Sequence, residues 1–161
     1  KRSFVCGSFG KTYHITGWKI GSCIAPAYLT AEFRKLHQWV TFSSATPLQY
    51  ALSDYLKEPA HYLGLSDFYQ KKRDLFASQF AGSAWKVLPS AGSFFQCLDY
   101  SAISNEKDVD LAERLTREIK VASIPVSVFY ETDPGDKILR FCFAKEDEML
   151  LEAAKRLVQI L

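Results

Sequence analysis

Short apolar runs bounded by glycine and proline alternate along this chain with longer segments whose apolar residues recur at helical spacing. A short apolar run between turn residues is typical of a buried strand, and an apolar repeat every three or four residues is typical of an amphipathic helix. The runs predict strands over residues 3–9, 18–25, 86–89, 93–100, 121–130 and 138–144. The repeats predict helices over residues 29–40, 46–57, 66–81, 108–119 and 146–161. This alternation predicts an α/β layered fold.

Capping residues and helix breakers mark the ends of several predicted helices. Thr46 stands before Pro47, so we expect its hydroxyl to cap a helix whose first residue is the proline. Thr30 is the expected cap of the preceding helix. Pro59 is expected to end the helix that follows Thr46, and Gly82 the one after it.

Three parts are expected along the chain. Residues 1–45 hold the first two strands and the first helix, residues 46–83 hold connecting helices, and residues 84–161 form a compact α+β domain. The chain opens in what reads as the middle of a strand, without an initiator methionine, which suggests a piece of a longer protein.

Charge and composition argue against several classes of partner. Twenty basic residues stand against eighteen acidic ones, so the formal net charge of +2 gives no reason to expect a nucleic acid or an anionic membrane as a partner. No run of about 18 apolar residues is present that could cross a membrane. The three histidines share no spacing, so no metal site is predicted. The four cysteines form no C-x-x-C pair and are interpreted as reduced core thiols of a cytoplasmic protein.

Lys11 follows a glycine and precedes a threonine, which first suggests the end of a phosphate-binding P-loop. A P-loop also needs a glycine five positions before Gly10, and that position is Val5, so this interpretation fails. A lysine flanked by Phe9 and Tyr13 can instead be partly desolvated, which favours the neutral, nucleophilic amine that forms Schiff bases. The plain alternative is a solvated loop lysine.

The segments Ser8-Phe9-Gly10-Lys11-Thr12 and Thr16-Gly17-Trp18-Lys19-Ile20-Gly21 resemble the lysine segment of fold-type I, pyridoxal-phosphate-dependent aminotransferases of class I/II. The similarity is greatest to the branch that holds methionine and kynurenine–glutamine aminotransferases. Residues 46–47, 92–95 and 139–144 also look like landmarks of this family. The resemblance covers less than half of a complete member. It implies the C-terminal part of the fold: the end of the large-domain sheet plus a small α+β C-terminal domain.

The resemblance also implies roles for individual residues. Lys11 is expected to bind pyridoxal 5'-phosphate as a Schiff base and then to move the proton at the substrate α-carbon, while Ser8 and Lys19 hold the phosphate. Arg140 is expected to bind the substrate carboxylate, because its guanidinium offers two parallel donors. Because side chains alternate along a strand, Arg140 is expected to point to the other face from Leu139 and Phe141. The alternative is an arginine on a solvent-exposed face of the sheet. Phe94 is expected to face the substrate side chain.

The implied reaction is transamination between methionine, or another bulky uncharged or aromatic amino acid, and a 2-oxo acid. In the family the groups that bind the cofactor ring precede the lysine segment, so we expect these 161 residues alone to be catalytically incompetent and the complete protein to be a homodimer. Three alternatives remain open: a C–S β-lyase of the same fold, a pyridoxal-dependent regulator, and a non-catalytic interaction domain.

Overall fold

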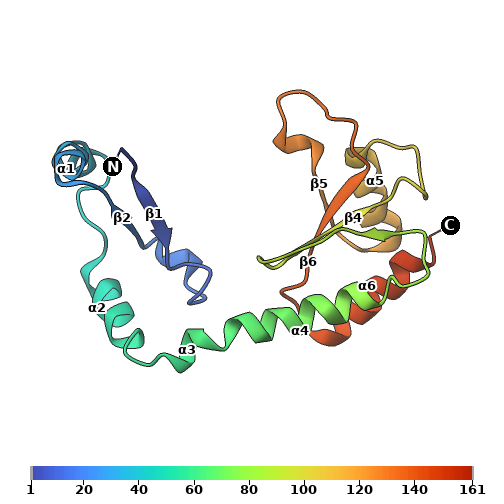
Figure 1. Ribbon diagram of the computed structural model, residues 1–161, viewed down its shortest axis with the longest axis horizontal. Coiled ribbons are helices and arrows are strands. Elements are labelled where there is room, and N and C mark those ends of the chain that lie inside the picture. The colour runs from blue at the N-terminus through green and yellow to red at the C-terminus, as the bar shows by residue number, and fades with distance from the viewer. Residues whose placement is uncertain (1, 161) are drawn as a thin grey trace. The chain divides into compact units, whose positions relative to one another are not determined.

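A computed structural model describes residues 2–160 and divides the chain into two compact units at Leu65 and Ser66 (Figure 1). The units are described separately below. The part boundaries expected at residues 45 and 83 stay a prediction about the organisation of the complete protein. No helix among residues 2–160 is long and apolar enough to cross a bilayer.

The first unit is built on an antiparallel hairpin followed by helices. Strand β1 spans Val5–Ser8 and strand β2 spans Gly21–Ile24, and they pair so that Val5 lies opposite Ile24. The short 3₁₀ helix η1, Thr16–Trp18, lies in the connection between them. Helices α1, α2 and α3 follow at Ala27–Val40, Thr46–Tyr55 and Ala60–Leu63. Both predicted strands are therefore present but shorter than expected, since Trp18 belongs to η1.

The helix starts differ from the predicted caps. Pro26, not Thr30, is the N-cap of α1, and the Thr30 hydroxyl donates a hydrogen bond to the carbonyl of Ala25 at 3.1 Å from inside the first turn. Ala45 is the N-cap of α2, so Thr46 is its first helical residue. The cap predicted for α2 is wrong by one residue because Pro47 also fits the second helical position. The cap predicted for α1 is wrong because the helix already begins at Ala27, before its apolar repeat.

The second unit is an antiparallel sheet covered by helices. Its strands are β3 (Lys86–Val87), β4 (Phe95–Asp99), β5 (Ile124–Pro125) and β6 (Ile138–Cys142), in the order β3-β4-β6-β5. The helices are α4 (Leu65–Ser78), α5 (Asp108–Arg114) continued by the π turn η2 (Leu115–Ile119), and α6 (Asp147–Val158). Helices α4 and α6 lie on the same side of the sheet (Figure 1), joined by an ion pair between Lys72 and Asp147 at 2.8 Å.

One face of this sheet forms the core. Buried and half-buried residues alternate along β4 and β6, so Leu98 and Leu139 point into a cluster that also holds Phe76 of α4 and Leu157 of α6. Leu98, Leu139 and Leu157 are completely buried. The apolar runs predicted these two strands because a half-buried strand alternates its side chains between two faces.

Two predictions are wrong: the long strand over residues 121–130 and the burial of the cysteines in the core. Residues 121–130 contain only the two-residue strand β5, followed by the 3₁₀ turn η3 (Ser127–Phe129), because Pro125 lacks the N–H that a longer ladder needs. The cysteines are not core thiols: Cys6 and Cys23 are exposed, and Cys97 and Cys142 lie half-buried on the sheet face opposite the core.

Candidate functional site

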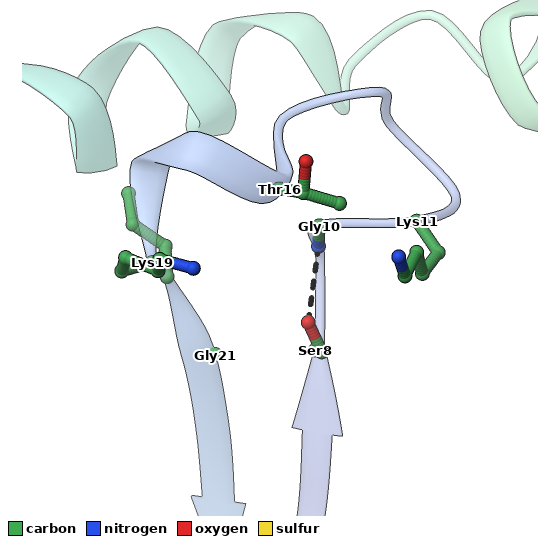
Figure 2. Close-up of a pocket in the computed structure, with 7 residues that line it drawn as sticks. Ser8, Gly10, Lys11, Thr16, Lys19 and Gly21 are labelled. Carbon is green, nitrogen blue, oxygen red and sulfur yellow. Dashed lines mark hydrogen bonds between the residues drawn. The ribbon is translucent and has the colours of Figure 1, made fainter.

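The connection between β1 and β2 forms one side of an open, solvent-exposed cavity of about 450 Å³. Its lining residues are Ser8, Gly10, Lys11, Thr16, Lys19, Ile20 and Gly21. Figure 2 shows Lys11 and Lys19 on either side of the Ser8–Gly10 segment, with Thr16 above it. All three residues that the sequence placed at the cofactor phosphate or its lysine, Ser8, Lys11 and Lys19, therefore line one cavity.

Backbone hydrogen bonds hold the loop that carries Lys11. The Phe9 N–H donates to the Ile20 carbonyl at 3.3 Å, which continues the hairpin ladder past the strand ends. Within the loop, the Ile15 N–H donates to the Gly10 carbonyl at 2.9 Å and the Tyr13 N–H to the Phe9 carbonyl at 3.2 Å. Lys11 lies between the donors and acceptors of these bonds, so the hydrogen bonds of the loop hold its backbone in place.

Two glycines let backbone segments approach closely at the cavity. A Cβ at Gly21 would lie 2.6 Å from the carbonyl oxygen of Gly7 on the opposite strand. A Cβ at Gly10 would lie 3.2 Å from the Thr16 Cα and 3.3 Å from the Ser8 Oγ. Lys19 adopts a left-handed conformation with φ 57°, which ends η1 and turns the chain into β2. Glycine at these two positions thus leaves space at the cavity that any larger side chain would fill.

The cavity is lined by groups that suit an anion. The Gly10 N–H donates to the Ser8 Oγ at 3.1 Å, which leaves the Ser8 hydroxyl proton for another acceptor. Thr16 adds a second hydroxyl, the two lysines add ammonium groups, and no carboxylate is among the lining residues. This set of hydrogen-bond donors matches a phosphate dianion. Lys11 itself is exposed, and Phe9 and Tyr13 pack against each other with ring centroids 5.9 Å apart.

Arg140 lies in the second unit, held between two aromatic rings. Its guanidinium carbon is 4.1 Å from the centroid of Phe95 and 4.9 Å from that of Phe129. Its Nε is buried and has no hydrogen-bond partner among residues 2–160. A buried donor without a partner costs free energy, and a role for Arg140 in binding the substrate carboxylate stays a prediction.

The family model for the class I and II aminotransferases matches residues 1–157. The chain belongs to this family. It is 50% identical to the methionine aminotransferase of Escherichia coli K12 across 99% of its own length and 42% of that protein. It is 31% identical to a kynurenine–oxoglutarate transaminase of Dictyostelium discoideum across 99% of its length and 42% of that protein. The chain thus spans about two fifths of the length of these relatives.

Solved structures match the fold as well as the sequence. An E. coli crystal structure reported with a methionine aminotransferase function aligns with a TM-score of 0.93 at 50% identity, over 98% of this chain and 42% of that one. An N-succinyldiaminopimelate aminotransferase of Mycobacterium tuberculosis aligns with a TM-score of 0.91 at 29% identity, over 100% of this chain and 42% of that one. These matches confirm the predicted fold, the C-terminal part of a fold-type I transferase.

Class I and II aminotransferases use pyridoxal phosphate, and the donors around the hairpin cavity of this chain fit its phosphate. The aromatic neighbours of Arg140 were missed from the sequence. Phe95 reaches Arg140 because β4 pairs with β6, and Phe129 reaches it from the 3₁₀ turn η3, where a strand was predicted. An aromatic residue next to a predicted functional strand was the one signal available, and it does not distinguish core from site.

Phe94, the remaining predicted site residue, lies in the second unit. Phe94 packs against the core cluster, with its ring 4.7 Å from that of Phe95 and 6.1 Å from that of Tyr69, so its contact with a substrate stays a prediction. No group of three or more His, Cys, Asp or Glu residues within residues 2–160 is arranged to hold a metal ion.

Proposed function

We propose that this chain supplies the reactive lysine, part of the phosphate site and the carboxylate-binding arginine of an aminotransferase. The reaction moves an amino group between methionine, or another bulky uncharged or aromatic amino acid, and a 2-oxo acid. The observation that carries the proposal is the hairpin cavity, in which two lysines and two hydroxyls converge without a carboxylate. The names of the methionine and kynurenine transaminases among the relatives support the substrate class.

Ser8, Thr16 and Lys19 hold the phosphate of pyridoxal phosphate in this proposal. The Ser8 Oγ accepts a hydrogen bond from the Gly10 N–H, and its own O–H donates to a phosphate oxygen. Lys19 adds a positive charge from the end of η1, before β2, and the left-handed backbone at this residue sets the direction of its side chain. Bound there, the cofactor supplies an electron sink for the substrate α-carbon.

Lys11 has two tasks. Its Nζ would hold the cofactor before substrate binds. Afterwards it would take the proton from the substrate α-carbon as general base and then release that proton as general acid. The tight loop between Phe9 and Ile15 limits how far this lysine can move, which keeps the amine near the reacting atoms.

Arg140 binds the substrate carboxylate through two parallel N–H donors. Stacking between Phe95 and Phe129 keeps the guanidinium plane in one orientation, which reduces the entropy lost on binding. Phe94 contacts the substrate side chain in this proposal. We further propose that the complete protein is a cytoplasmic homodimer.

Reductive trapping tests the proposed lysine. The chain is incubated with pyridoxal phosphate, treated with borohydride and mapped by peptide mass spectrometry, and the label is expected at Lys11. Lys11→Ala is expected to abolish the label and Lys19→Ala to weaken it. Lys57→Ala, an exposed lysine paired with Asp54 outside the cavity, is the matched control and is expected to leave labelling unchanged. Label spread evenly over many lysines would contradict the proposed site.

A further inference from the structure

One buried carboxylate of the second unit has no part in the transamination proposed above. Asp108, the first residue of α5, is only 4% exposed, although none of the ion pairs among residues 2–160 includes it. An aspartate is seldom buried to this degree unless its oxygens are satisfied. Asp110 stands in the same helical turn and is exposed, so a favourable interaction with the helix dipole does not require burial. The burial of Asp108 therefore needs another explanation.

Both carboxylate oxygens of Asp108 bind one residue, Ser127. The Ser127 backbone N–H donates to Oδ2 at 2.7 Å, and the Ser127 hydroxyl donates to Oδ1 at 2.6 Å. Hydrogen bonds to an ionised acceptor are about twice as strong as bonds between neutral groups. Two such bonds to a single residue fix both the position and the orientation of the start of η3 against α5.

Ser127 begins the turn that carries Phe129. The Phe129 N–H donates to the Val126 carbonyl at 3.2 Å, so the turn is closed by its own hydrogen bond. The ladder that joins this segment to the sheet ends earlier, because strand β5 stops at Pro125. The hydrogen bonds to Asp108 therefore attach the turn to α5 beyond the point where the sheet holds it.

Phe129 in turn contacts Arg140 of β6. The centroid of its ring lies 4.9 Å from the guanidinium carbon. Val128 alone lies between Ser127 and Phe129, so both ends of the path belong to one turn of 3₁₀ helix. A shift at the start of this turn moves the ring with it. The position of the ring against the guanidinium thus depends on the contact between Asp108 and Ser127.

We propose that Asp108 is a positioning residue for substrate binding: through Ser127 it holds Phe129 against Arg140 and keeps the guanidinium in the orientation that receives the substrate carboxylate. This inference rests on the carboxylate-binding role proposed above for Arg140. A guanidinium that is already held in one orientation loses less entropy when it binds a carboxylate. Loss of the Asp108 contact therefore weakens the binding of a carboxylate more than that of a neutral ligand of the same shape.

The test compares two ligands that differ at the carboxylate. 3-Phenylpropanoate is an aromatic carboxylate without an amino group, so it cannot enter transamination, and 3-phenylpropanamide carries a neutral amide in place of the carboxylate. Their dissociation constants are measured by isothermal titration calorimetry on the complete protein that contains this chain, loaded with pyridoxal phosphate. The weaker ligand is measured by displacement of the stronger one. The ratio of the two constants reports the contact with the carboxylate, and a general loss of stability leaves it unchanged.

Four variants follow the path from the carboxylate ligand to Asp108. Arg140→Met is expected to lower the preference for the carboxylate about tenfold or more, because hydrogen bonds to a charged group are lost. Asp108→Ala and Phe129→Leu are each expected to lower it about two- to fivefold, which is the contribution of one stacked ring. The double variant is expected to lose no more than Phe129→Leu alone, because both changes act on the same ring. Asp108→Asn is expected to keep the preference, since its amide accepts from the Ser127 N–H and donates to the Ser127 hydroxyl.

A control and a milder variant separate positioning from stability. Leu157→Val removes a methylene from the completely buried core of α6 and is expected to lower the melting temperature without changing the preference. Ser127→Ala loses only the hydroxyl bond and is expected to lower the preference, which keeps the test open where Asp108→Ala does not fold. An unchanged preference in Asp108→Ala and Ser127→Ala, or additive losses in the double variant, would overturn this inference alone, provided that Arg140→Met lowers the preference. An unchanged preference in Arg140→Met would overturn the proposed role of that arginine as well.

Discussion

A methyl group added at Gly21 meets the backbone of the neighbouring strand. The added Cβ would lie 2.6 Å from the Gly7 carbonyl oxygen, whereas ordinary contacts begin near 3.4 Å. The oxygen belongs to the backbone and cannot rotate away as the end of a side chain can. Gly21→Ala is therefore expected to push β1 and β2 apart at the edge of the cavity.

The magnitude follows from what overpacking costs. Inserting a methyl group where nothing can yield destabilises by about 1–3 kcal/mol. If this strain acts on opening of the hairpin, the equilibrium constant for opening increases about 5- to 150-fold.

Amide hydrogen exchange measures this opening residue by residue. The Phe9 amide, which donates to Ile20, and the ladder amides of β1 and β2 are expected to exchange faster in Gly21→Ala by that factor. Amides of β4 and β6, in the other unit, serve as the internal reference.

Gly17→Ala is the matched control on the same hairpin. No atom lies within 4 Å of a Cβ at Gly17, which belongs to η1. This change is expected to leave exchange unchanged or to slow it, because alanine at a compatible position stabilises by about 0.4–1 kcal/mol through a lower entropy of the unfolded chain. If Gly21→Ala exchanges no faster than Gly17→Ala, the close approach of the two strands is refuted as the reason for glycine at this position.

Three further outcomes concern the second unit. Leu98 is completely buried in the core, so Leu98→Ala is expected to lower the free energy of unfolding by about 2–5 kcal/mol in urea titration, and a loss below about 1 kcal/mol would contradict that packing. Burial, and then the negative charges of nearby carboxylates, raise the pKa of Tyr100 to about 12. The contribution of the neutral Tyr100 side chain to stability is therefore complete below about pH 10 and is lost as pH rises through about 12. The stability difference between the unaltered chain and Tyr100→Phe should shrink over that range, and parallel pH profiles would argue against it. In a double-mutant cycle, Arg140→Met and Phe129→Leu are expected to show about 0.5–1 kcal/mol of coupling in urea titration, whereas additive effects would mean that the ring does not hold the guanidinium.

Much of the fold could be predicted from local pattern. Strands β4 and β6 and helices α4 and α6 fall within their predicted ranges or within one residue of them, because alternation and helical repeats report directly on which face is buried. Residues 121–130 could not be predicted in the same way. Their apolar, β-branched composition favours a strand, but Pro125 and the turn at η3 end the ladder after two residues.

The candidate site divides in a similar manner. Ser8, Lys11 and Lys19 were identified from a contiguous segment, and the structure places them around one cavity. Phe95 and Phe129 were missed because they approach Arg140 through strand pairing and chain reversal, which a linear pattern does not encode. The cysteines were interpreted as core residues from their composition, and their actual faces depend on sheet register.

The amino-acid sequence by itself determined the family, the α/β character and the lysine segment, because these depend on residue types at short, regular spacing. Only the tertiary structure decided that Arg140 lies against two aromatic rings, with no partner for its Nε among residues 2–160, and that Cys6 and Cys23 are cross-strand partners. The physical reason is register. Shifting one strand by a single residue would move every side chain to the other face of its sheet, and pairing between segments distant in the chain sets that register.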